Sequence, residues 1–254
     1  MDLQLKGKVA VITGGAKGIG KGIAECLAGE GVNVVINYRS DPENAAKVEK
    51  DFTEKYANLS YTFGEILSWT LMWAFFATFT NYFLGMLVAI LINNAGLGCP
   101  NGDFETVNYD DWQYGIDNNV NGQFRTCQKY VKYWKQNKME GHIVNVLSKS
   151  CFMTNSIRNQ AYASAKGGLT ALTRSLANEV IHYGIYVNGI IPGYVQTERA
   201  HAPGTERYNR MISKLPTGKF GTPADMGAVA TFLCSPLANQ VIGACIDCTG
   251  GTLL

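Results

Sequence analysis

Short apolar runs recur along the chain and alternate with segments long enough to form helices. Continuous runs of this kind are typical of strands in a parallel sheet whose two faces are both covered. Six are expected to be strands: residues 9–12, 32–36, 87–92, 143–147, 185–191 and 241–246. Because strands that alternate with helices are joined by right-handed crossovers, the pattern predicts an α/β fold with a doubly wound parallel sheet.

The segments between the runs are expected to be helices. They cover residues 19–29, 41–56, 110–136, 160–183 and 224–233. Asp41 followed by Pro42 is a typical helix start, and Pro223 with Asp225 forms a second one. The 254 residues show no internal repeat and no linker, which predicts one domain over residues 1–254.

A glycine-rich turn follows the first apolar run. Gly14, Gly18 and Gly20 stand at the spacing G-x-x-x-G-x-G and lead into the first expected helix. Glycine is needed where the backbone bends tightly, where a pyrophosphate approaches it, and where the helix packs on the strand. The helix N-terminus offers free N–H groups and the positive end of its dipole. Taken alone, the turn indicates either a dinucleotide site or an ordinary strand-to-helix connection.

Two cations lie near the expected position of the adenosine ribose. The second apolar run is followed by Arg39 and Ser40, where sheets that prefer NAD carry an acidic residue. Lys17 lies inside the glycine-rich turn. Because cations attract a ribose 2′-phosphate, the sequence predicts NADP(H) in preference to NAD(H), with NAD(H) as the second candidate.

A phenol and an ammonium share one face of the fourth expected helix. Tyr162 and Lys166 are four residues apart, so their side chains are neighbours. An adjacent ammonium favours the phenolate and lowers the pKa of a tyrosine from its ordinary value of about 10. Tyr162 is therefore a candidate general acid–base, although the spacing alone is more often an ordinary helix surface.

Six motifs, in order, resemble those of the short-chain dehydrogenase/reductase family in its common form of about 250 residues. They are TGxxxGIG at 13–20, NNAG at 93–96, NVNG at 119–122, the strand 143–148, YxxxK at 162–166, and Pro192-Gly193 with Thr197. Within the family, the chain most resembles glucose 1-dehydrogenases and 3-oxoacyl-carrier-protein reductases. The resemblance implies a Rossmann-type sheet of about seven strands with helices on both faces.

The resemblance implies a role for each matched residue at the reacting centre. Tyr162 would exchange a proton with the substrate oxygen, and Ser148 would hydrogen-bond the same oxygen. Lys166 would hold the nicotinamide ribose and lower the pKa of Tyr162. Asn119 would anchor a water that links Lys166 to solvent. Ser150 is the alternative candidate for the catalytic serine, but the family pattern selects Ser148.

A larger set of residues is implied to lie along the cofactor and the substrate. The cofactor set is Gly14, Lys17, Gly18, Ile19, Gly20, Arg39, Ser40, Glu65, Asn94, Ala95, Gly96, Tyr162, Lys166, Pro192, Gly193, Val195 and Thr197. The substrate set is Ser148, Asn155, Tyr162 and Tyr194. Residues 195–220 carry mixed charges and are expected to form a lid over the substrate.

One segment departs from the family pattern. Residues 66–102 contain no charged residue, although charged residues make up 17% of the chain. Three interpretations compete: a membrane-inserted segment, a helix covered by a partner subunit or a lipid surface, and a local scramble such as a shifted reading frame. The expected strand 87–92 must pair inside the sheet, which argues against membrane insertion.

Composition and spacing exclude several other classes. The net charge of +2, without a basic block, gives no sign of a nucleic-acid partner. No His, Asp or Glu cluster has metal-ligand spacing, so no metal is expected. The seven cysteines are irregularly spaced, which argues against a disulfide framework. Residues 1–10 do not resemble a signal sequence, so a cytoplasmic location without membrane association is expected.

We therefore expect an oxidoreductase that interconverts a secondary alcohol and a ketone or aldehyde by hydride transfer with NAD(P)(H). Its partner would be a small carbonyl or alcohol compound, and the resemblance implies a homotetramer or homodimer. The alternative within this class is a 3-oxoacyl-carrier-protein reductase, whose basic docking patch could use Arg125, Lys129 and Arg174. The alternative in a different class is a non-catalytic NADP(H)-binding sensor, which the full set of four catalytic-type residues disfavours.

Overall fold

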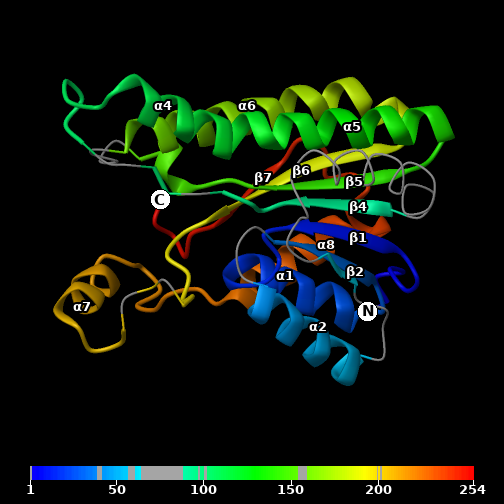
Figure 1. Ribbon diagram of the computed structural model, residues 1–254, viewed down its shortest axis with the longest axis horizontal. Helices are drawn as coiled ribbons and strands as arrows, with labels where there is room; N and C mark the ends of the chain where they lie inside the picture. The colour runs from blue at the N-terminus through cyan, green and yellow to red at the C-terminus, as the bar shows by residue number, and fades with distance from the viewer. Residues whose placement is uncertain are drawn as a thin grey trace.

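A parallel sheet of seven strands forms the centre of the computed structural model (Figure 1). The structure describes residues 2–38, 42–56, 61–63, 88–96, 98–99, 102–153, 159–198, 200 and 202–254. The strands are β1 (Val9–Thr13), β2 (Asn33–Asn37), β3 (Tyr61–Phe63), β4 (Val88–Asn93), β5 (Gly141–Val146), β6 (Ile185–Pro192) and β7 (Cys245–Cys248). Their order is β3-β2-β1-β4-β5-β6-β7, and every pair is parallel. The predicted doubly wound sheet is confirmed.

Helices cover both faces of this sheet (Figure 1). One layer holds α4 (Tyr109–Ile116), α5 (Gly122–Asn137) and α6 (Gln160–Val180). The other holds α1 (Gly18–Gly29), α2 (Pro42–Tyr56) and α8 (Pro223–Leu233). The short α7 (Glu206–Ile212) stands apart from both layers in Figure 1. Single turns of 3-10 helix cover Lys149–Cys151, Ile181–Tyr183 and Pro236–Ala238.

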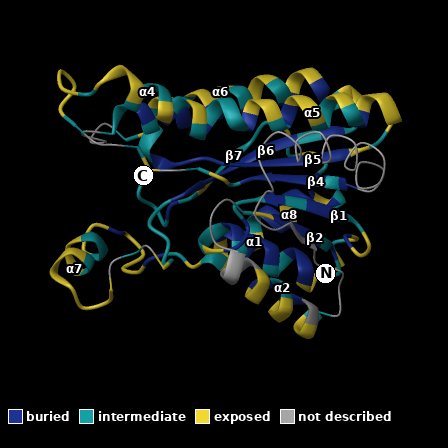
Figure 2. Cartoon of the chain, viewed as in Figure 1, coloured by how far each residue is buried: buried dark blue, intermediate teal, exposed yellow. Residues whose placement is uncertain are grey.

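Burial on both faces explains the unbroken apolar runs. In β4, Ile90 and Ile92 belong to the core beneath α1 and α8, whereas Leu91 belongs to the core beneath α5 and α6. Successive side chains of a strand point to opposite faces, so a strand covered on both sides is apolar at consecutive positions. Figure 2 shows the resulting buried centre between two partly exposed helical layers.

Some predicted boundaries differ from those in the structure. The last strand begins at Cys245 rather than at residue 241, because Gly243 has a φ of +68°, outside the range that a strand allows. The three-residue β3 is too short to give an apolar run, and α7 lies in the charged segment that was expected to be a lid. The expected helix 110–136 is divided by a π-helical turn at Asp117–Asn121.

The charge-free segment is described only in part. Residues 88–93 form β4, as the apolar run predicts. Residues 66–87 lie outside the described part of the chain, so the three interpretations of this segment stay open. None of the helices in the described ranges is both long and apolar enough to cross a membrane.

The strand order reverses beside β1, which pairs with β2 on one side and β4 on the other. The crossovers from β1 and β4 therefore run to opposite faces, and a crevice opens at the carboxyl ends of these strands. Glycine-rich residues follow β1, and Asn94 follows β4 at this edge. The fold thus places the predicted phosphate-binding turn where ligands bind in open α/β sheets.

His142 in β5 is expected to make the fold less stable in acid. The side chain is buried and stacks on Tyr186, with ring centroids 4.9 Å apart. Burial, assisted by the charge of Lys8, lowers the pKa of His142 to about 4. Between about pH 6.5 and pH 4, His142 is therefore protonated in the unfolded chain but neutral in the folded chain. The free energy of unfolding consequently falls as the pH drops through this range.

Replacing His142 with Phe is expected to remove roughly 3 kcal/mol of stability loss between pH 6.5 and pH 4. Denaturant unfolding at a series of pH values would measure this slope. His182→Phe is the matched control, because that histidine is exposed beyond the end of α6. An unchanged slope in His142→Phe would contradict the assignment.

Candidate active site at the carboxyl edge of the sheet

The glycine-rich turn has the close packing that a cofactor cradle needs. Gly14 and Gly18 have φ values of +67° and +56°, which favour glycine. A Cβ on Gly20 would collide with the Gly14 carbonyl oxygen and would lie 2.5 Å from Asn94 Nδ2. The first turn of α1 contains no acidic residue, so its N–H groups and positive dipole end can bind a phosphate. Lys17 is exposed immediately before this helix.

Thr13 and Asn94 connect this turn to the end of β4. Asn94 donates from Nδ2 to the carbonyl oxygens of Thr13 and Gly14, both at 3.0 Å. The Thr13 hydroxyl accepts from the backbone N–H groups of Asn94 and Ala95, at 3.0 and 2.9 Å. These four hydrogen bonds hold the two strand ends in register, so the predicted cofactor residues 14–20 and 94–96 lie together.

The chain after β6 closes the crevice from the other side. Pro192 ends β6, and a Cβ on Gly193 would lie 2.7 Å from the carbonyl oxygen of Thr249. Val195 then forms a parallel bridge with Gly221. Thr197 returns to the glycine-rich turn, since its Cγ2 lies 3.4 Å from the Cβ position of Gly18. Ile19, the second residue of α1, is partly buried beside this turn.

Ser148, Tyr162 and Lys166 meet at the end of β5. Ser148 lies two residues after the end of the strand, and its hydroxyl is hydrogen-bonded to Tyr162 on α6. Ser148 also contacts the hydroxyl of Ser150 at 3.2 Å, so both candidate serines lie near the phenol. Lys166 is buried and donates from Nζ to the carbonyl oxygen of Val146 at 2.8 Å. The Lys166 Nζ lies 5.8 Å from the centroid of the Tyr162 ring.

Asn119 reaches the same centre from the π-helical turn. Its side chain is fully buried, and Nδ2 donates to the carbonyl oxygen of Gly115 at 3.0 Å. A Cβ on Gly96 would lie 2.8 Å from Asn119 Oδ1 and 3.5 Å from Lys166 Nζ. The amide oxygen and the ammonium therefore face one small space, which glycine keeps open. π-Helical turns occur frequently at functional sites because they redirect a side chain within a helix.

The electrostatics differ from the expectation for Tyr162. The lowered pKa expected from Lys166 is not found: burial raises the pKa of Tyr162, and the hydrogen bond from Ser148 only partly opposes this rise. The physical reason is that the Lys166 ammonium is directed to the Val146 carbonyl rather than to the phenol. Burial also lowers the pKa of Lys166 to about 8, against the opposing effect of the nearby thiols of Cys151 and Cys99.

Sequence reasoning found most of these residues and missed others. Arg39, Ser40, Glu65 and Asn155 lie outside the described residues. Tyr194 stacks on Phe220, with ring centroids 5.6 Å apart, at the base of the expected lid. Two further residues of this site belong to no sequence motif. They are Cys99, whose sulfur accepts from Asn119 at 3.7 Å, and Lys149, whose ammonium lies 3.2 Å from the centroid of the Tyr194 ring.

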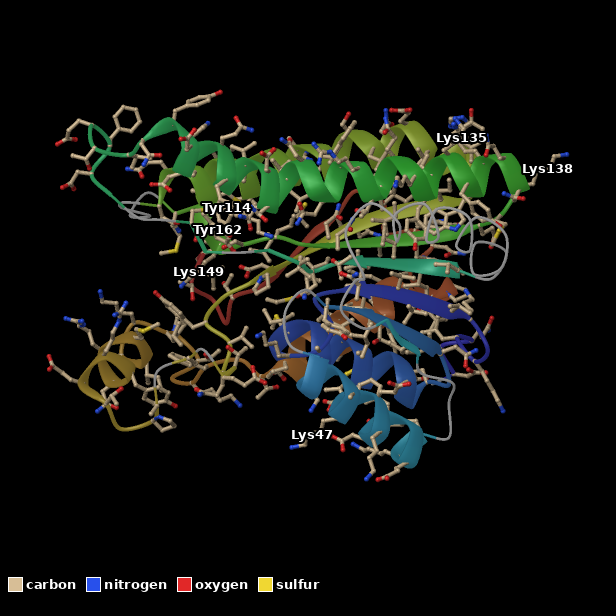
Figure 3. All side chains as sticks on the ribbon, viewed as in Figure 1. Lys47, Tyr114, Lys135, Lys138, Lys149 and Tyr162 are labelled. Carbon is tan, nitrogen blue, oxygen red and sulfur yellow. The ribbon has the colours of Figure 1, made fainter. Side chains whose placement is uncertain are left out.

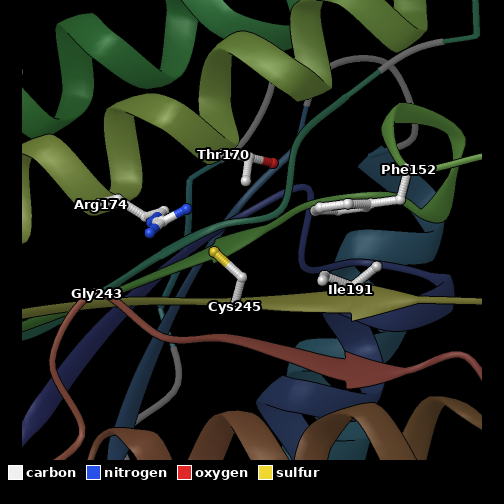
Figure 4. A pocket seen from close by; sticks show the side chains of 6 residues that line it. All are labelled: Phe152, Thr170, Arg174, Ile191, Gly243 and Cys245. Carbon is white, nitrogen blue, oxygen red and sulfur yellow. The ribbon is translucent and has the colours of Figure 1, made fainter. Parts of the chain in front are cut away.

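A separate cavity of about 250 Å³ lies between α6 and the strands β6 and β7 (Figure 4). Its lining residues are Phe152, Thr170, Arg174, Ile191, Gly243 and Cys245. The sequence suggests Arg174 for a docking patch together with Arg125 and Lys129, which are exposed on α5. In the structure, Arg174 lines this cavity and the other two lie on a different helix.

Comparison with known proteins agrees with this geometry. The family model for short chain dehydrogenases matches residues 8–207. Glucose 1-dehydrogenase 2 of Bacillus subtilis is 32% identical over 255 residues, which cover 100% of this chain and 98% of the relative. The 3-oxoacyl-[acyl-carrier-protein] reductase FabG of Aquifex aeolicus is 32% identical over 252 residues, covering 99% of each chain.

A solved structure resembles the whole fold. The protein assigned as a 2-deoxy-d-gluconate 3-dehydrogenase of Agrobacterium tumefaciens, solved with bound NADP, superposes with a TM-score of 0.84. It is 31% identical, and the match covers 99% of this chain and 98% of that one. The chain therefore belongs to the short-chain dehydrogenase/reductase family, whose members are NAD(P)(H)-dependent oxidoreductases that act on CH–OH groups of small molecules.

Proposed function

We propose that Tyr162 is the general acid–base of an enzyme that interconverts a secondary alcohol and a ketone or aldehyde, with NADP(H) preferred over NAD(H). The single observation that carries the assignment is the meeting of Tyr162, Ser148, Lys166 and Asn119 beside the glycine-rich crevice. The chain would act as one dinucleotide-binding domain over residues 1–254, with residues 195–220 as its lid.

The residues of the crevice fit a dinucleotide. The positive φ angles of Gly14 and Gly18 and the close contacts of Gly20 leave the main chain of the turn open to a pyrophosphate. Asn94, Ala95 and Gly96 would lie along one side of the cofactor, and Pro192, Gly193, Val195 and Thr197 along the other. The bound nicotinamide would supply or accept the hydride.

The protein groups would move the proton and hold the substrate. Burial raises the pKa of Tyr162, so its phenol is protonated near neutral pH and can give that proton to a carbonyl oxygen during reduction. Ser148 would donate to the same oxygen and polarise the carbonyl. Lys166 would bind the ribose, and a water between Asn119 and Lys166 would return a proton to Tyr162. In alcohol oxidation, the O–H proton would leave through Tyr162 along the reverse route.

A preference for NADP(H) is supported by the two cations and by the NADP bound to the Agrobacterium protein. Arg39→Asp is expected to weaken NADPH binding by about 10- to 100-fold and to leave NADH binding nearly unchanged, because only NADPH carries the 2′-phosphate. Fluorescence titration with both cofactors would measure the two affinities. The same charge reversal at Arg125, exposed on α5, is the control. Equal losses for NADPH and NADH in Arg39→Asp would contradict the preference.

The substrate side of the crevice would be formed by Ser148, Tyr162 and Tyr194, with Asn155 as a further candidate. The most direct test is a screen of sugars, sugar acids, steroids, simple ketones and acyl thioesters, in which NADPH absorbance reports turnover. Turnover of at least one alcohol or carbonyl compound is expected. Absence of turnover across the whole screen would count against the enzyme and in favour of the non-catalytic sensor.

A 3-oxoacyl-carrier-protein reductase is the second candidate, because FabG of Aquifex aeolicus is as similar to this chain as the glucose dehydrogenase is. The acyl thioesters of the screen distinguish the two. A homotetramer or homodimer is proposed on the family relationship alone, and light scattering after size-exclusion chromatography would measure the mass in solution.

A further inference from the structure

Lys149 is a buried cation beside the reacting groups. It directly follows Ser148, and only 8% of its surface is exposed. Its Nζ atom is buried and has no hydrogen-bond partner within the described part of the chain. The ion pairs in which both partners are described are Lys21–Glu25 and Lys50–Glu54, so no described carboxylate balances the charge of Lys149.

Aromatic rings hold the Lys149 ammonium in place. Nζ lies 3.2 Å from the centroid of the Tyr194 ring, and the Tyr194 ring stacks on Phe220 at 5.6 Å. Tyr208 of α7 contacts Phe220 in turn, with ring centroids 4.9 Å apart. A ring face attracts a cation, but it does not replace the lone pairs that three N–H donors can bind. The ammonium is therefore positioned without having its hydrogen bonds satisfied.

Lys149 lies near the candidate catalytic residues Ser148 and Tyr162. Ser148 at the end of β5 is hydrogen-bonded to Tyr162, and Tyr194 follows the end of β6. Both positions follow strands at the carboxyl edge of the sheet, where the reacting carbon would lie in the proposed function. Figure 3 shows Lys149 and Tyr162 at the same end of the molecule, whereas Lys135 and Lys138 lie at the opposite end.

We propose that Lys149 binds a carboxylate group of the substrate, so that the enzyme acts on hydroxy acids or oxo acids such as sugar acids. The proposal rests on the proposed function, because it assigns the substrate class of the same site. Burying an ammonium without an acceptor is costly, and an anionic oxygen offsets this cost better than a neutral one does. A carboxylate would accept a charge-assisted hydrogen bond from Lys149 Nζ, while the Tyr194 ring keeps its contact with the same ammonium.

The test compares acids with neutral amides of the same shape. D-Gluconate is paired with D-gluconamide, and 3-hydroxybutyrate is paired with 3-hydroxybutyramide. For each compound, kcat/KM with NADP⁺ and calorimetric affinity for the NADP⁺-loaded protein are measured. The wild type is expected to favour the acid of a pair. Lys149→Met should lower kcat/KM and affinity for that acid by about 10- to 100-fold, with the amide little affected.

Two further variants make the comparison specific. Lys149→Arg keeps the charge and should retain part of the preference for the acid. Lys135→Met is the matched control. Lys135 is exposed on α5, and its ammonium lies 4.0 Å from the Tyr183 ring centroid. This change therefore removes a similar Lys–Tyr contact at the opposite end of the molecule from Lys149. If Lys149→Met does not fold, as judged by thermal unfolding, Lys149→Gln takes its place in both measurements.

Equal losses for acid and amide in Lys149→Met would overturn the proposal, as would a wild type that favours the amides. If the wild type turns over none of the four compounds, the calorimetric measurement still decides. Acid binding that is lost in Lys149→Met supports the carboxylate site, whereas equal binding to both proteins, or no binding to the wild type, overturns it. The proposed function itself fails separately, when the broad screen finds no turnover or when Tyr162→Phe is as active as the wild type.

Discussion

Tyr162→Phe is expected to lower kcat/KM by about 10²- to 10⁴-fold, the usual range for the loss of a general acid–base. The substitution removes only the hydroxyl that is hydrogen-bonded to Ser148, so the ring and its packing on α6 remain. Cofactor affinity should be nearly unchanged, since Lys166 stays anchored to the carbonyl oxygen of Val146. Steady-state rates with a substrate from the screen, together with cofactor titration, measure the two effects separately.

Tyr183→Phe provides the matched control, because this exposed tyrosine lies before the amino end of β6, away from the crevice. Its rate should equal that of the wild type. A Tyr162→Phe variant that keeps full activity would contradict the assigned role. A variant that loses both activity and cofactor binding would show that the hydroxyl shapes the crevice rather than transferring the proton.

The sheet could be predicted because its cause is local. Each inner strand is covered on both faces, and this burial requires a mainly apolar run in the sequence, as in β4 and β5. The exceptions have identifiable reasons. β3 has only three residues, and the charged α7 buries none of its residues. The positive φ of Gly243 makes β7 begin later in the sequence than its apolar run does. Such features depend on neighbours elsewhere in the fold, which a hydropathy pattern does not contain.

The candidate site divides in the same way. Glycines 14, 18 and 20 and the pair Tyr162 and Lys166 have meaningful spacing, so the sequence identifies them. Lys149 has no such pattern, because a lysine beside a serine is ordinarily a surface residue. Its burial depends on Tyr194, which is 45 positions away in the chain but is brought beside it by the pairing of β5 and β6. The direction of the Tyr162 pKa shift likewise depends on where the Lys166 ammonium points.

The second large effect is expected from Gly20→Ala, which should weaken cofactor binding by at least about 10- to 100-fold. The new methyl group would collide with the carbonyl oxygen of Gly14 and would lie 2.5 Å from Asn94 Nδ2. The Gly14 oxygen is a main-chain atom, so the collision with it cannot be relieved by rotating a side chain. Either α1 must move away from the turn, or the turn must open, and both changes disrupt the phosphate cradle. Cofactor titration and thermal unfolding would measure the outcome.

Two other glycines of α1 separate a cradle effect from a packing effect. A Cβ on Gly22 would collide with Pro223 of α8, so Gly22→Ala should lower the unfolding temperature while the folded protein still binds cofactor with near-normal affinity. Among the described residues, a Cβ on Gly29 would meet Tyr56 alone, at 3.9 Å, so Gly29→Ala should be close to neutral. If Gly20→Ala bound cofactor as well as Gly29→Ala does, the close approach of α1 to the turn would not be what forms the phosphate site. A loss confined to Gly20→Ala would instead assign the binding energy to the main chain at the start of α1, where the N–H groups and the helix dipole act together.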